Sequence, residues 1–240
     1  MSERVLTVII GRAGSQGVPG KNTRDVAGRP CAAWTIDFAL ASERADTVLV
    51  STDDESLATL AREMGAETID RPASLATSTA RVDDALRDAV ARFDPEGRFS
   101  VVALLYANVP VRPSDLLDRA VEQLIETGAD SVQSYAAVGK HHPWWTCVVG
   151  DDGAVRPWEG ETLFHNTFRR QDLPPAHVPD GGVTVVRRAV LFGPCEGPHD
   201  FLGTKRAGVV TGEGDVIDID SEIDLIVADA VLRRRTGVAR

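Results

Sequence analysis

The stretch VLTVIIGRAGSQGVPGKN, residues 5–22, decides the fold of this chain. Its first part, Val5–Ile10, is almost entirely apolar and mostly β-branched, which is typical of a strand buried on both faces of a parallel sheet. The glycine-rich loop Gly11–Asn22 follows this strand directly. Ligands of open α/β sheets bind beyond the carboxyl ends of the strands, and glycine-rich backbone there exposes N–H groups that can cradle phosphates. The sequence therefore predicts a phosphate-binding loop at residues 11–22.

The spacing of the glycines excludes two familiar phosphate-binding motifs. The dinucleotide fingerprint needs G-x-G-x-x-G, whereas the first three glycines of this loop fall at positions 11, 14 and 17. A P-loop needs Ser or Thr after its Gly-Lys pair, and here Asn22 follows Lys21. Arg12 and Lys21 flank the loop, and residues 1–30 carry five Lys and Arg residues against two acidic ones. This cationic region favours a polyphosphate ligand; the alternative is an ordinary glycine-rich connection between a strand and a helix.

Strand-like and helix-like segments alternate along most of the remaining chain. Ser114 is the expected N-cap of the fourth helix and Gly128 its stop, and Ser221 with Asp224 is a possible capping pair for the last helix. This alternation predicts an α/β fold, with a mostly parallel sheet and helices on both faces. The expected strands are 5–10, 47–51, 99–105, 183–190 and 207–210, and the expected helices run near 34–41, 57–64, 82–93, 117–124 and 223–231.

The alternation breaks down over about residues 138–182, which are rich in Pro, Gly, His, Trp and Arg and have no strong helical period. Trp144, Trp145 and Trp158 lie there, out of four tryptophans in the chain. Aromatic side chains in an irregular insert often mark a subunit interface; a small satellite core under long loops is the alternative. We expect this segment to be an insertion of short strands and loops in the sheet domain.

Composition narrows the class of protein. The chain has 240 residues and a net charge of −10, which suits one domain over residues 1–240. The acidity argues against nucleic acid and anionic membranes as partners, because both require a basic face. No apolar run reaches the roughly 18 residues of a membrane span, and the three widely spaced cysteines suggest neither a disulfide framework nor a zinc site. We expect a cytoplasmic protein.

A second chemical signal is Val216–Asp220, which precedes the last helix. If this segment is the end of a strand, Asp218 and Asp220 share one face and Ile217 and Ile219 point to the other. Two such carboxylates can hold Mg²⁺, which prefers one or two carboxylates together with phosphate oxygens and water. The alternative is that Asp220 or its neighbour Ser221 only caps the helix.

Together these residues resemble the CMP-sialic acid synthetase family, the acylneuraminate cytidylyltransferases, in order along nearly the whole chain. The loop is similar to the family's R-G-G-S-K-G-x-x-x-K-N, and residues 50–54 are similar to its V-S-T-D-D. Arg71-Pro72, Arg170-Gln171 with Pro174, and residues 218–220 match its R-P, R-Q-x-x-P and D-I-D motifs. The resemblance implies a nucleotide-diphospho-sugar transferase-like fold, a homodimer formed through the inserted segment, and Mg²⁺-dependent use of CTP.

The resemblance also implies roles for individual residues. The phosphate contacts are Arg12, Lys21 and Arg71, and Asp218 with Asp220 holds the metal. Further CTP-binding positions are Ala13, Gly14, Ser15, Gln16, Gly17 and Asn22. The acceptor sugar acid, whose carboxylate needs a cation, is expected to meet Arg170 or Lys140 together with Gln171, Tyr106, Asn108 and Phe201.

Four positions depart from the family pattern. Ala13 replaces a glycine and Gln16 replaces a lysine of the loop, while Tyr106 replaces a sugar-reading glutamine and Thr184 a tyrosine. The phosphate and metal ends are thus kept and the sugar pocket is altered, so that other eight- or nine-carbon 2-keto sugar acids fit as well as N-acetylneuraminate. The alternatives are a nucleotidylyltransferase for a sugar phosphate and a non-catalytic nucleotide-binding homologue.

Overall fold

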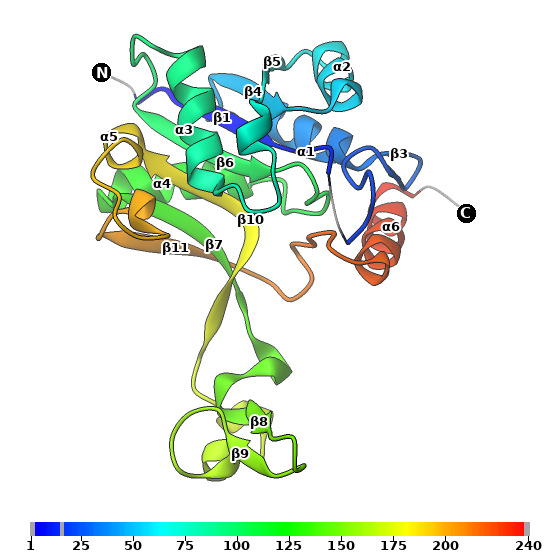
Figure 1. Cartoon of the computed structure of the whole chain (residues 1–240), viewed down its shortest axis with the longest axis vertical. Coiled ribbons are helices and arrows are strands. Elements are labelled where there is room, and N and C mark those ends of the chain that lie inside the picture. The colour runs from blue at the N-terminus through cyan, green and yellow to red at the C-terminus, as the bar shows by residue number, and fades with distance from the viewer. Residues whose placement is uncertain (1–2, 15–16, 238–240) are drawn as a thin grey trace.

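The computed structural model describes residues 3–14 and 17–237 and is built around one seven-stranded sheet (Figure 1). The strand order is β11-β7-β10-β6-β1-β4-β5, and β10 runs antiparallel to both of its neighbours while the other strands are parallel. The predicted mostly parallel sheet is therefore confirmed. The strands are β1 (Val5–Ile10), β4 (Thr47–Thr52), β5 (Glu67–Asp70), β6 (Val101–Tyr106), β7 (Ser131–Ala137), β10 (His177–Arg187) and β11 (Arg206–Thr211).

Helices cover both faces of the sheet because its central strands bury both rows of their side chains. On β1, Val5 and Ile9 pack with one set of helices, and Leu6 and Val8 pack on the opposite face with α3. The first set comprises α1 (Cys31–Leu40), α2 (Glu55–Glu63) and α4 (Leu116–Thr127). The opposite face carries α3 (Val82–Phe93) and the short α5 (Arg188–Leu191). The expectation of helices on both faces is confirmed.

Helix boundaries follow the expected stop signals more closely than the start signals. Gly128 ends α4 in the left-handed conformation, with φ 58°, as predicted. The prediction that Ser114 caps this helix is wrong, because the N-cap is Asp115. The reason lies in the preceding turn, where the N–H of Leu116 bonds to the carbonyl of Pro113 at 3.2 Å and delays the helix. The predicted strand 183–190 also stops early, at Arg187, where α5 begins.

The last helix, α6 (Glu222–Thr236), begins with the expected capping box of Ser221 and Asp224. It buries Ala228 and Leu232 against a small core beside the two-residue strands β2 (Asp25–Val26) and β3 (Arg29–Pro30). The apolar residues that mark its period in the sequence largely face outward, and Ile223 is 72% exposed. None of the helices among the described residues is both long and apolar enough to cross a membrane.

The inserted segment forms an arm that projects from the sheet domain (Figure 1). β7 and β10 lead into it, and β8 (Cys147–Val149) pairs with β9 (Val155–Pro157) near its tip. The ring of Trp144 stacks on His165 at 4.7 Å, so this tryptophan belongs to a satellite core within the arm. Trp158 is 65% exposed on the arm's surface. The satellite-core interpretation therefore holds for Trp144, and a subunit interface at Trp158 stays a prediction.

Candidate active site

A cavity of about 350 Å³ lies beyond the carboxyl ends of β1 and β6. Segments far apart in the sequence contribute its walls, as the position of the glycine-rich loop predicts. Its lining includes eight of the predicted site residues, namely Arg12, Gly17, Lys21, Asn22, Arg71, Tyr106, Asn108 and Asp220. Ser15 and Gln16 lie outside the described residues.

The beginning of the loop is fixed by two side chains. The buried Asn22 donates from Nδ2 to the carbonyl of Arg12 at 3.1 Å, and Asp53 at the end of β4 accepts the N–H of Ala13 at 2.9 Å. Gly11 permits this close packing, since a Cβ there would lie 2.6 Å from Leu57. Ala13 and Gly14, both predicted CTP contacts, do not line the cavity, and the Ala13 N–H is occupied by Asp53.

The end of the loop packs against the D-I-D segment. Lys21 donates from Nζ to Asp220 Oδ1 at 2.7 Å and to the carbonyl of Ile219 at 2.9 Å. A Cβ on Gly17 would lie 2.2 Å from the backbone oxygen of Asp220, so only glycine allows this approach. Residues 199 positions apart in the sequence are thereby joined at one edge of the cavity.

The D-I-D segment is extended but is not the strand end that the alternation suggested. It forms a single antiparallel bridge, between Ile217 and Val111, because the chain opposite it, residues 108–111, is itself irregular. The alternation survives locally, since Ile219 is fully buried and Asp220 is exposed. Asn108 donates from Nδ2 to Asp218 Oδ1 and fixes the first carboxylate. Burial and the neighbouring charge of Asp220 raise the pKa of Asp218 to about 6.

This donor set fits Mg²⁺ bound jointly with a phosphate ligand. Two carboxylates that repel one another are stabilised by a divalent cation between them, and Mg²⁺ keeps water and phosphate oxygens as its other ligands. The described residues offer no cluster of three or more His, Cys, Asp or Glu side chains for a metal held by protein alone. The competing view of Asp220 as a helix cap loses support, because Ser221 and Asp224 form the cap and Asp220 binds Lys21.

Another part of the cavity wall carries arginines. Arg71 is 6% exposed and donates from Nη2 to the carbonyl of Ser51 at 3.1 Å, while its buried Nε has no partner among the described atoms. Thr77, Ser78 and Arg81 also line the cavity, although sequence reasoning did not select them. The available signal was their place, a polar run between the R-P motif and α3.

A buried arginine supports the segment that carries Tyr106 and Asn108. Arg112 donates to the carbonyls of Tyr106 at 3.1 Å and Gly182 at 2.6 Å, and to the hydroxyl of Thr35 at 3.0 Å. Burial lowers the pKa of Arg112 to about 9. These bonds join β6, α1 and β10, so Arg112 is a structural support of the cavity that the sequence analysis did not identify.

The remaining acceptor residues are not brought to this cavity within one chain. Lys140, Arg170 and Gln171 are exposed residues of the arm, and Arg170 pairs with Glu213 at 3.2 Å. Phe201 is 9% exposed and packs in the core of the sheet's α3 face, and it does not line the cavity.

The sequence of this chain is similar to those of known proteins. The sequence profile of a family described as cytidylyltransferase matches residues 6–146. An N-acylneuraminate cytidylyltransferase of Streptococcus agalactiae is 31% identical over 223 residues, or 92% of this chain, and the chain spans only 51% of that protein's length. A CMP-N,N'-diacetyllegionaminic acid synthase of Legionella pneumophila is 29% identical over 231 residues, which cover 95% of this chain and 96% of that protein.

A solved structure agrees on the fold. A CMP:2-keto-3-deoxy-manno-octonic acid synthetase complexed with CTP superposes with a TM-score of 0.71, covering 97% of this chain and 100% of that chain at 17% identity. At that identity the likeness concerns the fold alone. The profile match extends over more than half of the sequence. The chain belongs to the cytidylyltransferase family.

Proposed function

We propose that this protein transfers CMP from CTP to the anomeric hydroxyl of a sialic-acid-like 2-keto sugar acid and releases pyrophosphate. Two relatives bear the names of enzymes for such acids, an N-acylneuraminate cytidylyltransferase and a CMP-N,N'-diacetyllegionaminic acid synthase. A protein of the same fold has been solved with CTP.

The observation that carries the proposal is the meeting of the loop and the D-I-D segment in one cavity. Arg12, Lys21 and Arg71 supply positive charge there, and Asp220 lies within hydrogen-bond distance of Lys21. A triphosphate with its Mg²⁺ needs both signs of charge at adjacent positions. An ordinary glycine-rich connection would need neither the close approach of Gly17 to the backbone of Asp220 nor the bond between Lys21 and Asp220.

The chemistry is an in-line displacement at the α-phosphorus of CTP. The anomeric oxygen forms a bond to phosphorus and releases its proton to solvent, and the bond from phosphorus to the bridging oxygen of pyrophosphate breaks. Such reactions depend mainly on positioning and charge stabilisation. Arg12 and Lys21 stabilise the departing pyrophosphate, and Arg71 binds a phosphate oxygen. Asp218 and Asp220 would hold Mg²⁺, which would supply charge neutralisation for the phosphate oxygens.

The acceptor side of the site is formed by Tyr106 and Asn108. Both line the cavity, and Asn108 is bonded to Asp218. Burial, and then the charge of Asp218, raises the pKa of Tyr106, so its phenol stays protonated and can donate to a sugar oxygen. The replacement of the family's glutamine by this larger ring favours an acceptor that differs from N-acetylneuraminate at the group it meets.

The arm supports a homodimer. Trp158 and Phe168 are 65% and 88% exposed on it, and large apolar side chains at such exposure are typical of subunit interfaces. The arm projects from its own sheet domain (Figure 1). A two-fold arrangement can place Lys140, Arg170 and Gln171 near the cavity of the second chain. In the proposed dimer these residues bind the acceptor across the interface.

A substrate panel tests the function. Pyrophosphate release is measured with each of CTP, UTP, ATP and GTP against a set of eight- and nine-carbon 2-keto sugar acids and a set of sugar phosphates. We expect pyrophosphate release with at least one sugar acid when CTP is the nucleotide, and no release with the other nucleotides or with sugar phosphates. Activity confined to sugar phosphates, or a preference for another nucleotide, would contradict the proposal.

A further inference from the structure

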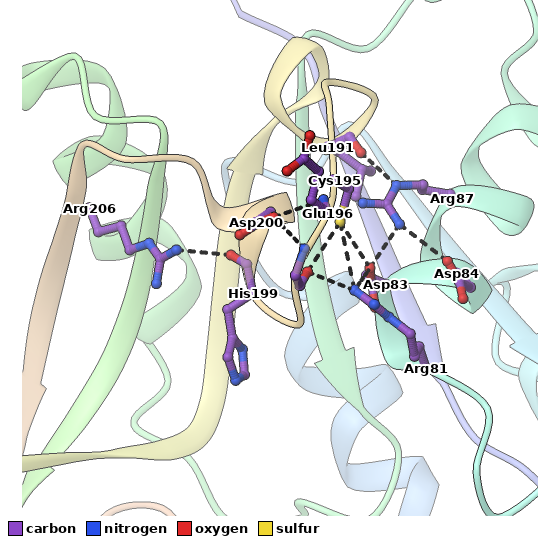
Figure 2. Close-up of polar contacts among 11 residues, drawn as sticks. Arg81, Asp83, Asp84, Arg87, Leu191, Cys195, Glu196, His199, Asp200 and Arg206 are labelled. Atoms are coloured by element: carbon purple, nitrogen blue, oxygen red, sulfur yellow. Dashed lines mark hydrogen bonds and ion pairs between the residues drawn. The ribbon is translucent and has the colours of Figure 1, made fainter.

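A polar cluster lies beside the cavity, at the beginning of α3, and joins that helix to the loop of residues 192–200 (Figure 2). Asp200 closes this loop by accepting the N–H groups of Glu196 at 2.8 Å and Gly197 at 2.5 Å. The carbonyl of Gly197 then accepts a hydrogen bond from Arg81 Nη2 at 3.0 Å. The loop therefore holds one edge of a guanidinium that also lines the cavity.

Asp83 is the fixed centre of the cluster, with a side chain that is 6% exposed. Its Oδ1 accepts from Arg81 Nε at 3.0 Å, and its Oδ2 accepts from Arg81 Nη2 and Arg87 Nη1, both at 2.8 Å. Burial raises the pKa of Asp83, but the hydrogen bonds from the two arginines outweigh this and leave it below its usual value. Arg87 Nη1 also pairs with Asp84 at 3.3 Å, so two carboxylates face the two guanidinium groups and Asp83 is the one that both arginines share.

The two arginines point to different places. Arg87 donates from Nε to the carbonyl of Leu191 at 2.7 Å, next to the end of α5, and does not line the cavity. Arg81 does line it, and its side chain is 41% exposed. Its Nε and Nη2 are bound to Asp83 and Gly197, whereas no hydrogen bond recorded among the described residues uses its Nη1.

The charge of the cavity wall favours an anionic ligand at this position. Four cations line the described wall, Arg12, Lys21, Arg71 and Arg81, against the single carboxylate of Asp220, because Asp218 is bonded to Asn108 and does not itself line the cavity. Lys21 is bonded to that carboxylate, which leaves the arginine side of the cavity positive. A guanidinium held by two planar bonds loses little further entropy when it binds an oxyanion.

We propose that Arg81 is a substrate-contacting residue that donates from Nη1 to an anionic oxygen of a bound substrate. The oxygen belongs either to a phosphate of the nucleotide or to the carboxylate of the acceptor, and Asp83 with the Gly197 carbonyl sets the orientation of the guanidinium. This inference rests on the proposed function, which supplies both anions. It distinguishes Arg81 from Arg87, which shares Asp83 but attaches α3 to the end of α5 and does not line the cavity.

The experiment compares Arg81→Gln with Arg87→Gln. Each change removes one cation from the cluster and leaves Asp83 a remaining arginine partner, so each protein should fold. For both variants and the wild type, CTP is titrated calorimetrically with Mg²⁺ present, the KM values for CTP and for the acceptor found in the panel are measured, and the melting temperature is recorded. Arg81→Lys, which keeps the positive charge but lacks the planar guanidinium group, is a further variant.

We expect Arg81→Gln to weaken the binding of one substrate by roughly tenfold to a hundredfold, which is the effect of losing a hydrogen bond to a charged group. A rise in the Kd and KM of CTP would show that Arg81 contacts a phosphate of the nucleotide. A rise in the acceptor KM alone would show that it contacts the carboxylate of the acceptor. The substrate affinity of Arg81→Lys should fall between those of the wild type and Arg81→Gln. Arg87→Gln should lower the melting temperature while both KM values stay within about twofold of wild type.

Unchanged substrate affinities in Arg81→Gln, or equal changes in Arg81→Gln and Arg87→Gln, would overturn the inference and leave Arg81 a structural link. The failure of the proposed function is distinguishable, since it appears as a wild-type protein that releases no pyrophosphate with any pair in the panel. In that case the CTP titration decides alone, and an unchanged Kd in Arg81→Gln contradicts the inference.

Discussion

The phosphate end of the cavity and the arm hold their polar and aromatic side chains in different ways. Lys21 is 18% exposed and has two hydrogen-bond partners on the D-I-D segment. On the arm, Phe168 is 88% exposed, and Arg170, itself exposed, pairs with the still more exposed Glu213. The phosphate end is therefore organised within a single chain, whereas the arm presents a surface that a second chain is proposed to cover.

The largest expected effect concerns the organised end. Lys21→Ala removes a cation beside the proposed site of the leaving pyrophosphate, and we expect kcat to fall on the order of 10²–10³-fold. The melting temperature should change little, because the partner carboxylate of Asp220 is 74% exposed and such ion pairs add little stability. Lys205→Ala is the control, since this lysine is bonded to Thr127 and does not line the cavity. A loss below tenfold in Lys21→Ala would remove Lys21 from the site.

The carboxylates of the D-I-D segment give the next effect. Asp220→Asn keeps the shape of the side chain and deletes one of the two charges proposed to bind Mg²⁺. We expect turnover to fall tenfold or more. The Mg²⁺ concentration for half-maximal rate should rise, because one negative charge fewer then faces the ion. Initial rates over a Mg²⁺ series measure both. Near-normal activity with an unchanged Mg²⁺ dependence would leave Asp220 as a residue that only positions Lys21.

The sequence predicts the organised end better than the arm. The apolar run Val5–Ile10 and the glycines that follow it are local signals, so a buried strand followed by a ligand-binding loop can be predicted from the sequence alone. The contact of Gly17 with Asp220 and the support given by Arg112 depend on pairings between distant segments. The outward apolar face of α6 shows the same limit, because a helical period does not say which face meets the core.

The exposed aromatic residues of the arm can be tested as a subunit interface. Replacing both Trp158 and Phe168 by Glu places charge on the proposed interface, and we expect self-association to weaken by about tenfold or more. Analytical ultracentrifugation over a concentration series measures this. Ile223→Glu is the matched control, because Ile223 is an exposed apolar residue on α6, away from the arm. Dissociation by Ile223→Glu alone would move the interface to α6, and a 25.7 kDa wild-type monomer at micromolar concentration would contradict the dimer.

The sheet body that carries both regions should depend on pH through Asp94, whose side chain is fully buried. Burial raises the pKa of Asp94, but the N–H groups of Phe99 and Arg98 and the side chains of Arg98 and Arg188 bring it below its usual value. A lowered folded-state pKa gives stability that is complete above the unfolded value, near 4, and is lost as the pH falls through the folded value.

Asp94→Asn should therefore lower the free energy of unfolding at pH 7 by about 2 kcal/mol and flatten its decline in acid. Urea titrations at pH 7, 5, 4 and 3 measure both quantities. Glu55→Gln, which changes a carboxylate that is 82% exposed, is the control and should follow the wild type. An equally steep acid decline in Asp94→Asn would show that other groups set the pH dependence.

The smallest effect separates the cap from the metal site. Ser221→Ala removes the capping hydroxyl of α6 and should cost about 1 kcal/mol of stability with little change in turnover. Asp220→Asn, one residue earlier, should show the reverse pattern. If Ser221→Ala reduces activity as strongly as Asp220→Asn does, then the start of α6 and the D-I-D segment act as one unit.

The most direct test of the central claim is to identify the bond that the protein makes. Phosphorus-31 NMR of the wild-type protein with CTP, Mg²⁺ and the sugar acid found in the panel follows the α-phosphorus through the reaction. We expect one new phosphodiester signal, from CMP joined to the anomeric oxygen, that grows in step with pyrophosphate. Persistence of CTP across the panel, or its conversion to free CMP without the phosphodiester, would contradict it.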